Sequence, residues 1–496
     1  MSGNSGEEGN LKIAVARTIK WNVIDRVSSQ VLYAVTGIVL ARMLSQEDFG
    51  LVTAILVFQA FASLFIDSGF SSALIQRKDP TRLDYSTVLW FNLGTAVALY
   101  IILFFAAPWI ATLFGGDERL IPLARVMFLS FILNASAIVQ TNMLMKRMEV
   151  KMVAVSNSAG LIAGSVIGIY MAVTGWGAWA IVWQNIAIAS VKSLILWLTG
   201  GWRPLYAFSM ESLRSCFAVG SGVMVTSFLN TAFQNISGFF IGLKVGLAPL
   251  GYYGQADKWS KMGVMSLSQV LTASFLPLLS KVQDDGERYA RMCGKTHRFT
   301  AYLLFPAMGL LIVMAAPIFH TLFGTKWDPS IPLFQILLGQ GIFTVLMLLY
   351  RNFILGLGKA KLLVVTEVVR DVTAVVAIIV VLPYIGLETP ESPVEGLKYL
   401  LFGQFIASAL TWGSTLYYVI RLTRRSLWAY LFDLAPYCVL TALIMVPCLL
   451  ISQLDVHPLA ICVMQGLTAL VLYLGCNYLM HSKIQRDAIA YFRGRL

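Results

Sequence analysis

Long apolar runs separated by short polar connections dominate this sequence of 496 residues. A helix needs about 20 apolar residues to cross the hydrocarbon core of a bilayer, and fourteen stretches of the chain meet that length. Since hydrocarbon offers no partner to backbone polar groups, only helices and closed barrels span a membrane. The runs lack the alternation of barrel strands, so the sequence predicts an all-α polytopic membrane protein with about 14 transmembrane helices. The predicted spans are 21–43, 49–75, 84–107, 120–145, 152–174, 177–199, 215–243, 250–280, 297–323, 331–356, 362–386, 396–420, 429–452 and 457–480.

The composition supports this class and explains the basic charge. Hydrophobic residues make up 58% of the chain and charged residues 12%, which excludes an ordinary soluble protein. Of the 37 Lys and Arg residues, 25 lie in segments on one side of the predicted bundle and 5 on the other. Cytoplasmic loops carry the excess of Lys and Arg, so we expect both termini in the cytoplasm and the protein in a bacterial cytoplasmic membrane. The net charge of +12 therefore reflects topology and predicts no nucleic-acid partner.

No pattern typical of an enzyme appears. The six cysteines occur singly, and the chain has no Walker A loop, GxSxG or HExxH motif. The sequence therefore predicts no catalytic residue, no metal and no cofactor. The first apolar run lacks a small-residue cleavage site, so we interpret it as a retained span.

An internal repeat divides the chain. The segment from Pro108 to Gly115 shares the pattern PxxxTLFG with the segment from Pro317 to Gly324, and Ile121-Pro122-Leu123 recurs about 210 residues later. Six spans separate the copies, as in transporters with parallel repeats, whose substrate site lies between two lobes. We predict an N-terminal six-helix lobe (1–199), a cytoplasmic linker (200–214), a C-terminal six-helix lobe (215–425), and two extra helices with a basic tail (426–496).

Polar residues inside the spans are the candidate site. An ionisable residue within a spanning helix is costly unless it faces a partner or water. In the first span Asn22, Arg26, Ser29, Tyr33 and Thr36 recur at helical spacing and share one face. Such a stripe predicts a helix that faces a polar cavity. The other candidates on the first hairpin of each predicted lobe are Asp25, Asp67, Asn230, Gln234, Asp257, Lys258 and Lys261.

Structural roles compete with binding roles for several of these residues. Asp25 beside Arg26, and Asp257 beside Lys258, suit ion pairs or side chains that extend toward the interface. Asp67 suits a role in shaping the end of its span. Glu367, Arg370 and Asp371 are spaced to pair with one another, and the role of Arg351 is open.

Two stretches carry a family resemblance: LARMLSQEDFGLVTAILVFQAFASLFIDSGFSSALIQRKD (40–79) and SFLPLLSKVQDDGERYARM (274–292). They resemble the polysaccharide-exporter branch of the MOP superfamily, whose members are oligosaccharide-lipid flippases of the O-antigen, colanic-acid and teichuronic-acid type. The likeness extends from about residue 15 to 425. It implies a flippase that moves an undecaprenyl-diphosphate-linked oligosaccharide across the cytoplasmic membrane by alternating access, for surface polysaccharide or lipopolysaccharide synthesis. It further implies that Arg26, Lys258 and Lys261 meet the diphosphate.

The expected partners are this lipid-linked substrate and the membrane lipids, with the chain a monomer or associated with a glycan polymerase. Alternatives are a multidrug or cation antiporter of the same superfamily, a membrane glycosyltransferase or polymerase, and a non-transporting scaffold. The short loops disfavour the enzyme, and polar stripes within the spans disfavour the scaffold.

Labelling of single cysteines tests the predicted orientation. In a background without other cysteines, Gly116→Cys and Ser330→Cys should react with an impermeant thiol reagent in intact cells, because both positions are expected outside. Gly286→Cys should react only after permeabilisation. Labelling of Gly286→Cys in intact cells would contradict the orientation drawn from the charge asymmetry.

Overall fold

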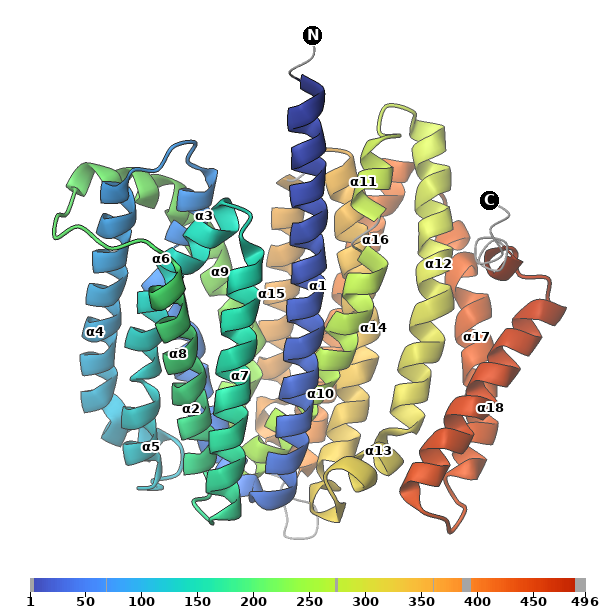
Figure 1. Cartoon of the computed structure of the whole chain (residues 1–496). Coiled ribbons are helices and arrows are strands. Elements are labelled where there is room, and N and C mark those ends of the chain that lie inside the picture. The colour runs from blue at the N-terminus through green and yellow to red at the C-terminus, as the bar shows by residue number, and fades with distance from the viewer. Residues whose placement is uncertain (1–3, 68, 273–274, 360, 386–393, 487–496) are drawn as a thin grey trace. The chain divides into compact units, whose positions relative to one another are not determined.

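The computed structural model describes residues 4–67, 69–272, 275–359, 361–385 and 394–486. These residues are helical with connecting turns, which confirms the predicted all-α class (Figure 1). Ser274, the first residue of the second family signature, and residues 487–496 of the basic tail lie outside the described residues. Contacts between Cα atoms group the chain into unit 1 (residues 1–251) and unit 2 (residues 252–496).

Unit 1 contains nine helices among its described residues and the start of a tenth, α10 (Leu247–Thr272). The nine are α1 (Asn4–Met43), α2 (Gln46–Asp67), α3 (Phe70–Gln76), α4 (Arg82–Leu113), α5 (Leu120–Met127), α6 (Ser130–Lys146), α7 (Val150–Val173), α8 (Trp179–Thr199) and α9 (Met210–Lys244). Helix α7 packs between α1 and α8, α6 packs against α4 and α8, and α2 and α3 pack against α9. Phe70, Leu89, Met143, Trp202 and Cys216 belong to the apolar core at one end of this unit.

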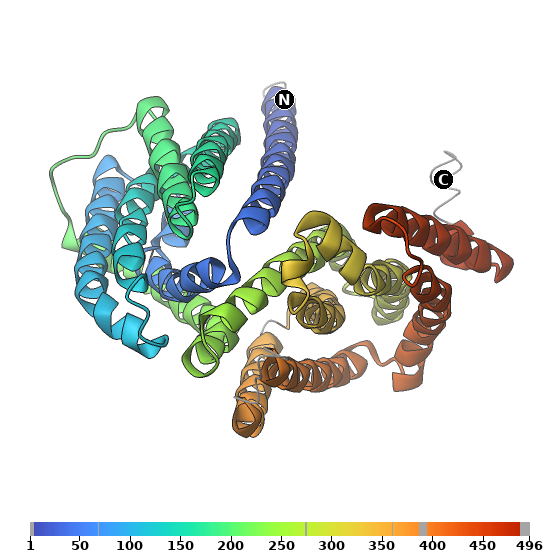
Figure 2. The ribbon, with the colours of Figure 1, turned by 90° about the horizontal axis from the view of Figure 1, so that it is seen from below.

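Unit 2 contains the rest of α10 and, among its described residues, α11 (Phe275–Ser280), α12 (Gly286–Val313), α13 (Ala315–Leu322), η1 (Thr325–Trp327), α14 (Ser330–Gly356), α15 (Lys361–Val381), η2 (Leu382–Tyr384), α16 (Glu395–Thr423), α17 (Leu427–Ile451) and α18 (Pro458–Leu479). Helix α14 packs against α12 and α16, and α16 packs against α15. The two helices predicted to lie outside the repeat, α17 and α18, pack against each other and against α12. Figure 2 shows α15 and α18 on opposite sides of this unit.

The described helices account for the fourteen predicted spans. Ten helical stretches are long and apolar enough to cross a membrane, and α9 makes an eleventh when its two segments, bent by 53°, are taken together. The other three predicted spans correspond to α10, α15 and α16, which have 26, 21 and 29 residues. Asp257, Lys258 and Lys261 interrupt the apolar run of α10, and Glu367, Arg370 and Asp371 interrupt that of α15.

Some helices extend well beyond the predicted spans. Helix α12 begins at Gly286, eleven residues before the predicted start of its span at 297, because Asp285 caps it by accepting a hydrogen bond from the backbone N–H of Arg288. Such side-chain caps satisfy backbone donors that a helix leaves unpaired at its first turn. Hydropathy marks where a helix is apolar, whereas caps mark where it begins.

The predicted lobe boundaries follow the sequence repeat and stay a prediction. The repeat assigns α9 to the second lobe, while α9 packs against α2, α3 and α4 of unit 1. A backbone contact contributes to this packing: a Cβ atom on Gly69 would lie 2.3 Å from the carbonyl oxygen of Gly220 on α9. Gly69 has a φ of 72° and separates α2 from α3.

A ladder of small residues brings α7 and α8 together. Cβ atoms added to Gly160 and Gly164 would each lie 2.8 Å from a carbonyl oxygen of α8, those of Ile188 and Gln184. Small residues at such spacing let helix backbones approach closely in membranes. The second ladder behaves differently, because Gly242 accommodates the ring of Phe114.

Replacing Gly164 with leucine should therefore destabilise unit 1. The new side chain has no room against α8, and overpacking of this kind costs about 1–3 kcal/mol. Thermal unfolding of the detergent-purified protein should show a lower midpoint for Gly164→Leu. The matched control is Gly475→Leu on α18, where a Cβ meets nothing within 4 Å; an equal loss in both variants would contradict the packing role.

Candidate functional site

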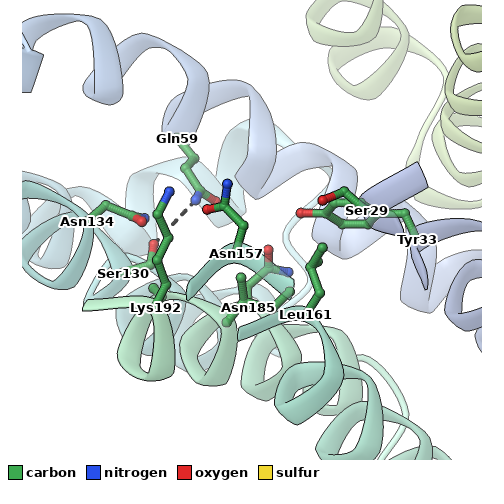
Figure 3. A pocket seen from close by; sticks show the side chains of 11 residues that line it. Ser29, Tyr33, Gln59, Ser130, Asn134, Asn157, Leu161, Asn185 and Lys192 are labelled. Atoms are coloured by element: carbon green, nitrogen blue, oxygen red, sulfur yellow. Dashed lines mark hydrogen bonds between the residues drawn. The ribbon is translucent and has the colours of Figure 1, made fainter. Parts of the chain in front are cut away.

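A polar cavity of about 340 Å³ lies inside unit 1, between α1, α2, α6, α7 and α8 (Figure 3). Hydroxyl and amide side chains dominate its wall, and Lys192 is the one charged residue among those that line it in the described part of the chain. The lining residues are Ser29, Tyr33, Gln59, Ser130, Asn134, Asn157, Leu161, Asn185, Ile188, Ala189 and Lys192. This is an arrangement that can hydrogen-bond a polar solute and offers it one cation.

Helical spacing places the groups on the cavity wall. On α8, Asn185 and Lys192 are seven residues apart, so both lie on the face that points inward. Gln59 of α2 donates a hydrogen bond from Nε2 to Oγ of Ser130 at 3.3 Å. The Oε1 atom of Gln59 is shielded from solvent and has no partner among the described residues. Polar groups without internal partners, in a space of this size, indicate a cavity that holds water or a polar ligand.

The structure brings Asp25 to this cavity through Asn157. The Nδ2 atom of Asn157 lies 3.2 Å and 3.4 Å from the two carboxylate oxygens of Asp25. Asp25 is also close enough to Lys192 for electrostatic attraction. A carboxylate and a lysine thus lie near the same cavity, and Asn157 of α7 holds the carboxylate of α1 in place.

The polar stripe of α1 divides between several environments. Ser29 and Tyr33 line the cavity, whereas Thr36 is buried and donates a hydrogen bond to Ser165 Oγ of α7 at 2.6 Å. Asn22 and Arg26 are exposed and are not among the lining residues. The residues on this face of α1 therefore do not all line the cavity. The expected contact of Arg26 with the diphosphate stays a prediction.

Asp67 lies at the break between α2 and α3. Its Oδ1 atom accepts hydrogen bonds from the backbone N–H and the hydroxyl of Ser71. The Ser71 hydroxyl in turn accepts a hydrogen bond from Asn142 Nδ2 of α6 at 2.7 Å. These contacts fix the start of α3 against α6, which favours the shaping role for Asp67 over substrate contact.

The remaining candidates lie on α9 and α10. On α9, Gln234 is exposed and Asn230 half-buried. On α10, Asp257 forms an ion pair with Lys261 at 2.7 Å, four residues along the helix. The expected pairing of Asp257 with Lys258 is therefore replaced by one with Lys261, because residues four apart face each other on a helix while adjacent ones do not. Lys258 lies with its Nζ atom 5.7 Å from the ring centroid of Trp259.

The predicted pairing within α15 is confirmed. Arg370 contacts Glu367 at 2.6 Å and Asp371 at 2.9 Å. Arg351 of α14 approaches Glu367 at 3.7 Å, which gives this arginine a partner that the sequence did not reveal. Two arginines and two carboxylates thus compensate one another within unit 2.

Comparison with known proteins shows what kind of protein holds these groups. The family described as "Polysaccharide biosynthesis protein" matches residues 39–332, more than half of the chain. The chain belongs to this family. The resemblance read from residues 40–79 and 274–292 is thereby confirmed.

Relatives of this polysaccharide biosynthesis protein include transport proteins. The succinoglycan biosynthesis transport protein ExoT of Rhizobium meliloti is 27% identical over 365 residues, which are 73% of this chain and 74% of ExoT. The lipopolysaccharide biosynthesis protein WzxC of Escherichia coli is 26% identical over 325 residues, 65% of this chain and 66% of WzxC. Among solved structures, the lipid II flippase MurJ in an inward closed conformation matches with a TM-score of 0.70 at 16% identity, covering 95% of this chain and 100% of MurJ. At that identity the match establishes the fold alone.

Sequence reasoning about this family member missed Lys192. The signal was present, because Lys192 is the one charged residue in α8 and shares a face with Asn185. The other cavity amides, Asn134 and Asn157, come from α6 and α7. Asparagine carries no charge, so three asparagines on separate helices cannot be recognised as one site from the sequence alone.

Replacing Lys192 with methionine tests whether its ammonium holds the fold together. An ion that faces a polar cavity contributes little to packing, so the free energy of unfolding should stay within about 0.5 kcal/mol of wild type or rise. The structural comparison is Asp84→Asn, since the buried carboxylate of Asp84 pairs with Arg77 at 3.1 Å and its loss should cost about 3 kcal/mol. Unfolding in mixed micelles measures both. A loss in Lys192→Met as large as in Asp84→Asn would assign Lys192 to the scaffold.

Proposed function

We propose that this protein is a bacterial flippase that moves an undecaprenyl-diphosphate-linked oligosaccharide from the cytoplasmic to the outer leaflet. The observation that carries the proposal is the family match over residues 39–332 in a chain built of about fourteen membrane-spanning helices. ExoT, named as a transport protein of succinoglycan biosynthesis, supports transport as the activity. The different polysaccharides in the names of ExoT and WzxC leave the glycan of this chain open.

The cavity of unit 1 supplies chemistry suited to such a substrate. Sugar hydroxyls exchange hydrogen bonds with amides and hydroxyls, and Asn134, Asn157 and Asn185 offer both donors and acceptors. A cation in a low-dielectric site attracts a phosphate strongly, and Lys192 provides one. Arg26, Lys258 and Lys261 are the further cations assigned to the diphosphate.

Alternating access between two lobes gives the substrate a route while its lipid tail stays in the bilayer. With both termini in the cytoplasm, the membrane potential favours outward movement of an anion by about 2.3 kcal/mol per charge per 100 mV. The potential thus helps to drive a diphosphate outward. We infer that the protein transports without catalysing a covalent step, as a monomer or beside a glycan polymerase, in the cytoplasmic membrane.

Deletion of the gene tests the activity. Lipid-linked repeat units should accumulate on the cytoplasmic leaflet and the corresponding surface glycan should be lost, as measured by lipid extraction and surface staining.

Arg26→Glu should fail to restore the glycan at normal protein abundance, because it places a carboxylate where a cation should meet a diphosphate. Arg26→Lys should restore it in part, since the charge survives and the two-point contact with phosphate oxygens does not.

Lys20→Glu on the same helix is the matched control and should restore the glycan, because Lys20 lies off the polar stripe. Normal surface glycan in the deletion strain, together with raised drug sensitivity, would replace the flippase by a multidrug antiporter. Full activity of a well-expressed Arg26→Glu variant would remove Arg26 from the site and leave the flippase proposal standing.

A further inference from the structure

The linker between α8 and α9 is fixed to the side of α4. The backbone N–H of Leu205 donates a hydrogen bond to Oγ of Ser86 at 2.9 Å, and the carbonyl oxygen of Leu205 accepts one from Nε1 of Trp90 at 2.8 Å. The backbone N–H of Ser209 donates another to Oγ1 of Thr87 at 3.1 Å. Figures 1 and 2 show the linker, in green, looping past α4 at the edge of unit 1. These contacts hold the linker against one side of α4.

The fixed linker presents large apolar side chains outward. Tyr206 stacks on Trp90, with 5.8 Å between the ring centroids and 28° between the ring planes. Tyr206 is nevertheless 97% exposed, and Phe208 and Met210 are 48% and 56% exposed. Alternate residues of the linker thus expose a row of apolar side chains beside α4.

Two tryptophans of α4 mark the level of this row in the membrane. Trp90 and Trp109 are 19 residues apart, so they are separated by about 28 Å along the helix axis. This distance is close to the thickness of the hydrocarbon core, about 30 Å. Trp and Tyr are enriched at both membrane interfaces, where their rings lie at the level of the headgroups. The pair of Trp90 and Tyr206 therefore lies at headgroup level, on the side that the charge asymmetry predicts to be cytoplasmic.

Two arginines lie on the water side of this aromatic pair. Arg82, the first residue of α4, donates a hydrogen bond from Nε to the carbonyl oxygen of Arg203 at 3.0 Å. Arg203 donates one from Nη1 to the carbonyl oxygen of Trp197 at 2.7 Å. Both arginines are exposed, and neither has a carboxylate within 4 Å in the described part of the chain. The adjacent carboxylate, that of Asp84, pairs with Arg77 at 3.1 Å. Backbone carbonyls thus position the two guanidinium groups without neutralising them.

We propose that Arg82 and Arg203 bind the phosphate of an anionic phospholipid whose glycerol and first acyl carbons pack against Tyr206 and Phe208. Guanidinium groups form two-point contacts with phosphate oxygens, and basic clusters beside spanning helices recognise anionic headgroups. A soluble acidic partner would use the arginines alone, whereas a phospholipid at this level uses the arginines and the apolar row together. The lipid then holds the linker against α4. The proposal goes beyond transport and does not depend on the transported substrate.

Native mass spectrometry of the full-length protein in detergent tests this site with phosphatidylglycerol, phosphatidylethanolamine and inorganic phosphate. Wild type should bind phosphatidylglycerol in preference to the other two, since phosphatidylethanolamine carries an ammonium beside its phosphate. Each cationic side chain beside an anionic headgroup is worth roughly fivefold in affinity, so Arg82→Gln/Arg203→Gln should bind phosphatidylglycerol about 25-fold more weakly. Glutamine still donates a hydrogen bond to a backbone carbonyl, so the linker keeps its place. The control is Lys281→Gln/Arg288→Gln, which removes the same charge from exposed positions in unit 2 and should bind as wild type does.

Removing the exposed ring gives a second measure that leaves the charge unchanged. Tyr206→Ala should weaken phosphatidylglycerol binding, whereas Tyr478→Ala, which removes an exposed tyrosine from the end of α18, should not. Equal affinity of wild type for both lipids, or equal losses in the site and control variants, would overturn the proposal. Binding of inorganic phosphate as tightly as phosphatidylglycerol would show an ion site, and preference for undecaprenyl phosphate would show a substrate site; either result overturns a bound phospholipid.

Spin labels on single cysteines measure the depth of the linker in vesicles of phosphatidylglycerol and phosphatidylethanolamine. In the background without other cysteines, a label at Tyr206→Cys should meet dissolved oxygen and a water-soluble nickel complex to the same extent as one at Trp109→Cys, the expected level of the opposite interface. Gly286→Cys, at the exposed start of α12, gives the value for water. A label at Tyr206→Cys as accessible to nickel as that at Gly286→Cys would place the linker in water, where it suits a soluble partner, and would overturn the phospholipid site.

Discussion

The hydrocarbon core of a membrane offers no hydrogen bonds, so polar groups within the spanning helices of this protein need partners inside the protein or water. Charged side chains within the helices are compensated in a few distinct ways. Arg370 lies between two carboxylates on its own helix, Lys192 faces a polar cavity, and Asp433 is shared by two arginines at a helix end. A charged side chain whose partners are other protein groups serves to hold the structure. A charged side chain that faces space for water or a solute marks a candidate ligand site.

The interiors of the two units differ in this respect. In the aromatic core of unit 2, Tyr350 and His297 share a hydrogen bond at 3.0 Å, and Tyr430 and Thr423 share another at 3.0 Å. In unit 1, hydroxyl and amide groups surround open volume. The interior of unit 1 is therefore equipped to hold a polar solute.

Much of the fold was predictable because apolar runs follow from a single physical requirement. Each of the fourteen spans has a helix, since length and hydropathy report directly on the bilayer. The starts of helices such as α12 were not predictable from hydropathy, because Asp285 and not apolar content decides where that helix begins. The site was harder to predict from the sequence. Arg26 and Asp257 stand out as charges within apolar runs, but Asp257 forms an ion pair with Lys261 in the structure. Lys192 and its asparagines come from three successive helices, α6, α7 and α8, and no periodicity within one helix shows that they meet.

The contact between Gly69 and Gly220 has a consequence for how this protein can change over time. Most contacts in a protein core tolerate a larger residue on one side when a smaller one appears on the other. Here the backbone of Gly220 fills the space beside Gly69, with 2.3 Å between a Cβ on Gly69 and the oxygen of Gly220, so a smaller side chain on α9 would not make room. The left-handed φ of 72° at Gly69 adds a second, independent restriction. The crossing of the α2–α3 break with α9 is therefore a point at which geometry restricts the chain to glycine at Gly69.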